Sequence, residues 1–292
     1  MRALRGAGAL ARSHLLRSLR SRTALFWNFA FPLVWLFVFG AVFAGGTARG
    51  TGFLMPGLYA ITVLAISFAG ASYRMVKERE RGTLRRYRVT PVRAPAVVGA
   101  AAASSAALLA ASLLLMGVTA RLAFGTGPGD ALGGTVVVLA AGAVAFVPLG
   151  LMVGCAAPST ESAPAINNAV FFPLLFVTGA AIPFSMLPGW VREAGRALPP
   201  TYLVEALQAV LVRGEGLAGV RAEIGVLLVT GAVGAAAASL LFRWEPGQPV
   251  DRRRLAAALL GLGLLCAAVW WAGPELEMAA QAHPEGIRMP GG

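Results

Sequence analysis

Long runs without a charged residue dominate the pattern of hydrophobic and polar positions along the chain. A helix needs about 20 mostly apolar residues to cross the hydrocarbon core of a bilayer. Seven uncharged runs meet this requirement: 23–47, 50–73, 94–120, 131–157, 163–183, 224–242 and 255–273. Only Ala48 and Arg49 separate the first two runs, which we expect to form a tight hairpin. The pattern predicts an all-α polytopic membrane protein with seven spans.

Residues 184–223, between the fifth and sixth runs, are interrupted by proline and glycine. Pro188 and Pro199 end or kink helices, so the pieces between them are too short to span a membrane. We expect re-entrant or surface helices at the outer leaflet. Trp190 and Tyr202 would anchor them at the interface, where such amphipathic rings are enriched.

A basic stretch, residues 1–22, precedes the first run and holds six arginines and no acidic residue. On a helical wheel Leu4, Leu15 and Leu19 fall on one side. Arg2 and Arg17 fall on the other. This pattern is typical of an amphipathic helix lying on an anionic membrane surface, which we predict on the cytoplasmic side.

The positions of the basic residues predict the orientation. The loop 74–93 carries eight basic and two acidic residues, so the positive-inside rule places it in the cytoplasm. Alternation then places the N-terminus and the loop 243–254 inside, and these three segments hold 18 of the 25 basic residues. The C-terminal tail would be external. Trp270 and Trp271 suit the interfacial end of a seventh span, with a helix lying along the interface as the alternative.

Composition supports the membrane prediction and excludes other classes. The chain is 57% hydrophobic and 13% charged, where soluble domains are about a quarter charged. Its formal net charge of +12 could suggest nucleic-acid binding, but that requires a basic face in water, and we expect no nucleic-acid partner. Cys155 and Cys266 stand far from each other and from any histidine, so neither a disulfide nor a metal site is expected.

Candidate chemistry is sparse. No run carries an ionisable residue near its middle, which disfavours an ion-coupled secondary transporter. No cluster of Asp, His or Cys points to a membrane-embedded enzyme, and we expect no catalytic residue. The one lysine, Lys77, lacks the glycines of a P-loop. If ATP drives this protein, another subunit must bind ATP and Mg²⁺ and hydrolyse the nucleotide.

The most informative segment is 77–92, which reads KERERGTLRRYRVTPV. We expect the second span to continue as a helix to Arg81 and to break at Gly82, where glycine tolerates a left-handed backbone. A short helix would follow. Thr90 and Pro91 suit the N-cap and first turn of the third span. The result would be an elbow protruding into the cytoplasm.

The elbow resembles the corresponding segment of ABC type-2 exporter permeases, of the daunorubicin-resistance-like kind. The residues that carry the resemblance or its implied contacts are Lys77, Glu78, Glu80, Gly82, Thr83, Leu84, Tyr87, Thr90 and Pro91. In that family the segment docks into a groove of the ATPase subunit. The resemblance implies that Glu78 and Glu80 pair with basic groups on the ATPase or on the N-terminal helix. It also implies that Leu84 and Tyr87 supply apolar contact.

A second resemblance to the same family covers 165–211, with the fifth span and the short external helices that follow it. It is carried by the order of Asn167, Asn168, Phe171, Phe172, Phe176, Thr178, Gly179, Pro183, Leu187, Pro188, Gly189, Trp190, Leu198, Pro199, Pro200, Thr201 and Tyr202. For the substrate pathway we select Phe68, Asn167, Asn168, Phe171, Phe172 and Phe176. The alternative is that these phenylalanines face lipid or the core. The family core has six spans with both ends inside, and the predicted seventh span departs from it.

The resemblance implies an assembly in the bacterial plasma membrane. Two copies, or one copy with a related permease, would combine with two ABC ATPase subunits among membrane lipids. The expected cargo is a hydrophobic or amphipathic small molecule, such as a drug or antibiotic. A lipid or polysaccharide exporter of the same family is the alternative, and an ion-coupled transporter is less favoured.

The expected organisation has three parts. A connecting helix occupies 1–22, and a six-span permease domain occupies 23–244. That domain contains the elbow 74–93 and the external helices 184–223. A linker, the seventh span and the tail occupy 245–292.

Overall fold

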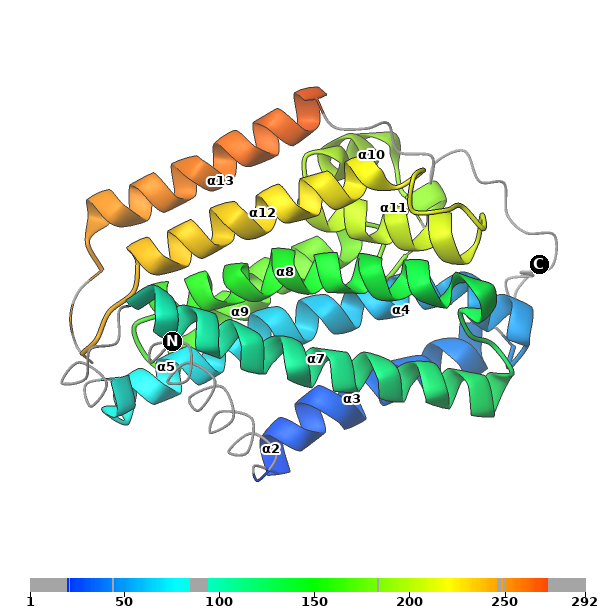
Figure 1. Ribbon diagram of the computed structural model, residues 1–292, viewed down its shortest axis with the longest axis horizontal. Helices are drawn as coiled ribbons and strands as arrows, with labels where there is room; N and C mark the ends of the chain where they lie inside the picture. The colour runs from blue at the N-terminus through cyan, green and yellow to red at the C-terminus, as the bar shows by residue number, and fades with distance from the viewer. Residues whose placement is uncertain are drawn as a thin grey trace.

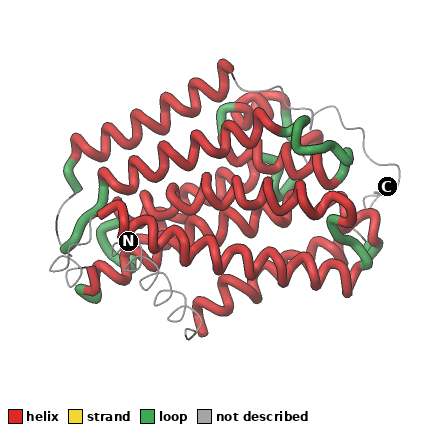
Figure 2. Tube along the Cα trace, viewed as in Figure 1, coloured by secondary structure: helices red, strands yellow, loops and turns green. Residues whose placement is uncertain are grey.

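The computed structural model of the protein describes residues 20, 22–43, 45–84, 94–182, 184–245, 248 and 250–272. All regular secondary structure in these ranges is helical, and the long helices lie side by side in one elongated bundle (Figures 1 and 2). Successive long helices run in opposite directions along the bundle (Figure 1). The all-α polytopic prediction is therefore confirmed.

The first four uncharged runs form helices close to the predicted bounds. The helical segments are α2 (Arg22–Leu25), η1 (Phe26–Ala30), α3 (Phe31–Val38), η2 (Phe39–Phe43), α4 (Ala48–Ala65), η3 (Ile66–Ala71), α5 (Ser72–Glu80), α7 (Ala94–Phe124), η4 (Gly129–Ala131) and α8 (Leu132–Ala156). η1, η2 and η3 are π-helical. This form is rare in proteins, and where it occurs it is often found at functional sites.

The second half of the chain contains long and short helices. They are α9 (Ser162–Val177), η5 (Phe184–Met186), α10 (Gly189–Arg196), α11 (Pro199–Leu211), α12 (Arg221–Leu240) and α13 (Arg252–Ala272). α9 ends six residues before the predicted boundary at 183. The cause is local, since Gly179 adopts a left-handed backbone with φ of 79°.

Five helices in the described ranges are long and apolar enough to cross a membrane. They are Ala48–Glu80, Val97–Phe124, Gly129–Ala156, Arg221–Leu240 and Arg252–Trp271. The first and fifth predicted spans correspond to the shorter apolar helices Asn28–Val42 and Ser162–Val177. Each of the seven runs is thus helical, and the count of seven spans stays a prediction.

α8 lies at the centre of the bundle and packs against α4, η3, α5, α7, α11 and α12. The close approach of α8 to η3 and α5 depends on two glycines of α8. Gly150 faces the carbonyl oxygen of Ser67 in η3, and Gly154 faces the backbone of Ser72 at the start of α5. Small residues allow such backbone approach between membrane helices, where apolar burial alone does not drive association.

α11 enters the helix bundle, and its re-entrant or surface position in a membrane stays a prediction. Twelve of its 13 residues are buried, because the helix packs among α4, α8 and α12. Tyr202 was expected at the interface and is instead 1% exposed, with its hydroxyl donating to the Arg196 carbonyl at 2.9 Å. Trp190 on α10 is 77% exposed and fits the expected interfacial anchor.

α13 lies beside α12 along the outside of the bundle (Figure 1). Leu265 and Val269 pack on Tyr202 of α11, while Leu260, Leu264 and other large apolar side chains remain exposed. The helix is therefore attached through one face and presents the other outward. That arrangement suits a span in contact with lipid, and the spanning of α13 stays a prediction.

Replacement of Gly150 by alanine tests the close contact between α8 and η3. An added Cβ would overlap the Ser67 carbonyl oxygen, and such overpacking costs about 1–3 kcal/mol of folding free energy. We expect a clear drop in the thermal midpoint of the detergent-solubilised protein. Gly133→Ala on the same helix is the matched control, because no described atom outside its own helix lies within 4 Å of its added Cβ. Equal midpoints for the two variants would contradict the packing argument.

Candidate functional site

The helix that begins with α4 continues through η3 and α5 to Glu80, and the chain then turns. Gly82 makes this turn possible, since its φ of 66° lies in the left-handed region. The chain is helical again at Thr83 and Leu84, where the described part of the elbow ends. The predicted continuation and break are confirmed for these residues. Tyr87, Thr90 and Pro91 lie outside the described residues, as do the N-terminal residues 1–19 and the tail beyond 272.

Arg79 of α5 binds the C-terminal end of α8. Its side chain is 2% exposed, and its guanidinium donates hydrogen bonds to backbone carbonyls. The acceptors are Gly154 at 3.2 Å, Cys155 at 3.3 Å, Pro158 at 3.4 Å and Ala157. These carbonyls form the C-terminal end of α8, where helical partners run out and the helix dipole is negative. The guanidinium of Arg79 supplies both hydrogen-bond donors for these carbonyls and a positive charge at the negative end of the helix dipole.

A second arginine, from the segment that follows α12, binds the same helix end. Arg243 donates to the carbonyl of Cys155 at 2.9 Å and to that of Ala157 at 3.1 Å, and it also reaches the carbonyl of Gln248. Burial lowers the pKa of Arg243 from its ordinary value. Two cations from distant parts of the sequence therefore converge on one helix terminus.

Glu80 extends the contact to the connection between α8 and α9. Its carboxylate accepts a hydrogen bond from the Thr160 backbone N–H at 2.8 Å and another from the Thr160 hydroxyl at 2.7 Å. Two residues further on, Ser162 begins α9, and its backbone N–H donates to the Ser159 hydroxyl at 3.2 Å. Arg79 and Glu80 of α5 thus both bind the connection between α8 and α9.

The other elbow residues have different environments. The Lys77 ammonium lies 5.3 Å from the centre of the Tyr73 ring, and Glu78 and Thr83 are half-buried. Leu84 is fully buried in the core of the chain itself. A contact between Leu84 and an ATPase, as the resemblance implied, would require this side chain to leave that core.

Most of the residues selected for a substrate pathway lie on α9. Asn168, Phe172 and Phe176 share one exposed face, and the two phenylalanines are 50% and 49% exposed. Phe171 is half-buried, with its ring centre 5.6 Å from that of Phe172. Asn167 is 3% exposed, and its side-chain oxygen has no hydrogen-bond partner among the described residues. Phe68 is apart from this face, since it is buried in the core at 4% exposure.

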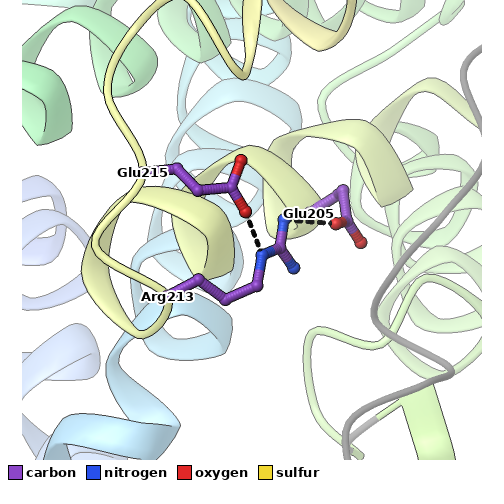
Figure 3. A network of polar contacts seen from close by, with 3 residues as sticks. All are labelled: Glu205, Arg213 and Glu215. Carbon is purple, nitrogen blue, oxygen red and sulfur yellow. Dashed lines mark hydrogen bonds and ion pairs between the residues drawn. The ribbon is translucent and has the colours of Figure 1, made fainter.

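Sequence reasoning missed an ion-pair network at the opposite end of the bundle (Figure 3). Glu205 of α11 has a side chain only 2% exposed, and it pairs with Arg213 at 2.7 Å. Arg213 also contacts Glu215. Burial alone would lower the pKa of Arg213, but the hydrogen bonds and charges of Glu215 and Glu205 raise it above its ordinary value. A single acid in the otherwise uncharged stretch 199–211 was the available signal.

The turn after α11 brings this network together. Gly214 adopts a φ of 72°, and the backbone N–H of Arg213 donates to the Gln208 carbonyl at 3.0 Å. This C-terminal cap folds the chain back, so that the Arg213 side chain reaches a glutamate two turns earlier in the helix (Figure 3). Within the described ranges no group of three or more His, Cys, Asp or Glu residues is arranged to hold a metal ion.

A comparison with known families decides the identity of the fold. The family model described as ABC-2 type transporter matches residues 6–212, which is most of the chain. The chain belongs to the ABC-2 type transporter family. The resemblance of the elbow and of the fifth span to this family is confirmed at the level of the family.

Individual proteins with sequences similar to this chain include other transport proteins. It is 27% identical to the inner membrane transport permease YhhJ of Escherichia coli over 63% of the chain and 49% of that protein. It is 26% identical to ABC transporter G family member 20 of Dictyostelium discoideum over 60% of the chain and 24% of that protein. Nodulation protein J of Rhizobium meliloti is 32% identical over 31% of the chain and 34% of its own length. The permease thus spans half or less of the length of these relatives.

Removal of Arg213 tests whether the buried ion pair holds α11. Arg213→Met leaves Glu205 buried without that cation, and breaking a buried pair in this way costs about 3–5 kcal/mol. We expect a large fall in the thermal midpoint of the permease in detergent. Glu215→Gln is the matched control, since the side chain of Glu215 is 33% exposed and exposed pairs contribute about 0–1 kcal/mol. A midpoint for Arg213→Met no lower than that of Glu215→Gln would show that the pair is dispensable.

Proposed function

We propose that this permease is the membrane subunit of an ATP-driven exporter that moves a hydrophobic or amphipathic small molecule out across the bacterial plasma membrane. The observation that carries the proposal is the α5 end of the bundle, where the elbow is tied to α8 and α9 through Arg79 and Glu80. A force applied to the elbow therefore acts on transmembrane helices. Family membership supports the same role.

The ATPase is a separate subunit in this proposal. The only lysine of the chain, Lys77, stands beside Tyr73 on α5 and lacks the glycine-rich loop that cradles nucleotide phosphates. ATP and Mg²⁺ would be bound by the partner, which docks at the elbow from the cytoplasm. The basic residues near the elbow and near Arg243 favour this orientation, with the N-terminus inside and the tail outside.

A second copy of the chain, or a related permease, would complete the pathway. The exposed face of α9 combines the amide of Asn168 with the rings of Phe172 and Phe176. Facing another such surface, it would line a path that is apolar with a few hydrogen-bonding groups. This chemistry suits a hydrophobic or amphipathic drug or antibiotic, and a lipid or polysaccharide precursor is the alternative within the family.

An ion-coupled mechanism is less favoured by the structure. Glu205 is the kind of buried carboxylate that could bind a coupling ion. It is, however, paired with Arg213 at 2.7 Å, so its charge is already neutralised by a residue of the same chain. ATP hydrolysis by a separate subunit therefore remains the better explanation for the energy source of transport.

Reconstitution with a P-loop ATPase encoded beside the gene tests the energy source. We expect proteoliposomes containing both proteins to accumulate hydrophobic fluorescent compounds when ATP is supplied, and to stop when vanadate blocks the ATPase. Liposomes with the permease alone and an imposed proton or sodium gradient are the control. Uptake driven by the gradient alone would overturn the proposal.

Alanine substitutions on α9 test the pathway. Phe172→Ala removes an exposed ring, and loss of one aromatic contact of about 1.5–3 kcal/mol would raise the cargo concentration for half-maximal transport about tenfold or more. Leu264→Ala on α13 is the control, because this side chain is equally apolar and 69% exposed on the outer helix. If both variants transported alike, the α9 face would be a lipid contact.

A further inference from the structure

Resting on the proposed function, we infer that Arg79 and Glu80 form the joint through which movement of the elbow reaches α9. Both residues belong to α5, and both bind the segment between α8 and α9. Arg79 holds the carbonyls that end α8, and Glu80 holds Thr160, two residues before α9 begins.

Adjacent positions on a helix point about 100° apart, so the two side chains approach the connection from different directions. Arg79 contacts carbonyls from Gly154 to Pro158, and Glu80 contacts both the backbone and the hydroxyl of Thr160. The connection is thereby fixed to α5 at two places. Displacement of α5 must move it as well.

The contacts are made mainly to backbone atoms. Five of the partners of Arg79 and Glu80 are main-chain groups, namely the carbonyls of Gly154 and Cys155 in α8 and, on the connection, the carbonyls of Ala157 and Pro158 and the N–H of Thr160. A side-chain partner could absorb a shift by changing its rotamer, whereas a backbone partner transmits the shift to the helix. Gly154 adds a direct steric contact with α5 through Ser72.

A comparison with Arg243 distinguishes two roles of Arg79, that of a cap on α8 and that of a joint between the elbow and the α8–α9 connection. Arg243 binds the carbonyls of Cys155 and Ala157, which Arg79 also binds, but it belongs to the segment after α12 rather than to the elbow. When Arg79 is removed, the end of α8 keeps a cation and hydrogen bonds from Arg243. The capping function is therefore largely duplicated, while the hydrogen-bonded link to the elbow is made by Arg79 and Glu80, beside the apolar packing of Val76 on Ala157 and Ala163.

The test compares ATP hydrolysis with transport in the reconstituted complex of permease and ATPase. For Arg79→Met we expect ATP hydrolysis to continue while transport per ATP falls about tenfold, within the usual range for coupling between two sites. Arg79→Lys keeps the charge and can bind one or two of the carbonyls, so it should restore part of the coupling. Arg252→Met is the matched control, since Arg252 is an exposed arginine at the start of α13 outside these contacts.

Thr160→Val provides a milder second variant that leaves every arginine in place. It removes one of the two hydrogen bonds to Glu80, so transport per ATP should fall about threefold, the equivalent of one hydrogen bond. This variant decides the matter if Arg79→Met fails to fold. Thermal midpoints of all variants are measured in parallel.

The outcomes separate the two proposals. If the wild-type complex shows no ATP-driven transport, the proposed function fails and the joint fails with it. If the wild type couples normally and Arg79→Met or Thr160→Val does so too, only the joint is overturned. A proportional loss of ATP hydrolysis, transport and thermal midpoint would identify Arg79 as a structural cap and would also overturn the joint. Reduced transport per ATP at an unchanged midpoint supports it.

Discussion

The attachment of the elbow to the bundle depends on the close approach of α8 to the continuous helix that runs from α4 into α5. Gly150 and Gly154 present no side chain there, so the carbonyl of Ser67 and the backbone of Ser72 can lie against α8. Only at this separation can Arg79 reach the last carbonyls of α8 from its place on α5. Small residues, rather than large apolar ones, therefore determine where the elbow is attached.

Charges near a membrane core need partners because the hydrocarbon cannot solvate them, and the permease supplies these partners locally. At the α5 end, Arg79 and Arg243 are satisfied by carbonyls of a helix terminus. At the opposite end, Glu205 is satisfied by Arg213 from the turn that follows its own helix (Figure 3). Between the two ends, the helices are joined by apolar and glycine contacts and by buried hydroxyl groups, such as that of Ser112, which donates to the carbonyl of Asn28.

Much of the fold and part of the site could be read from local patterns. The uncharged runs form helices in the structure, as predicted, since length and hydrophobicity are properties of each segment alone. Gly82 was correctly predicted to break the elbow, because a left-handed turn favours glycine wherever it occurs. The burial of Tyr202 and Leu84 was not predicted, because burial depends on which helices pack around a residue. Arg79 and Arg243 were counted only as positive charges that orient the chain.

The sequence by itself therefore determined that this is an all-helical membrane protein of one transporter family, because uncharged length and motif order are written along the chain. The tertiary structure decided that α11 enters the bundle, that Glu205 meets Arg213, and that Arg79 and Arg243 share the end of α8. Those contacts join residues up to 88 positions apart. A spacing of that length carries no periodic signal, so only the packing of the helices brings the partners together.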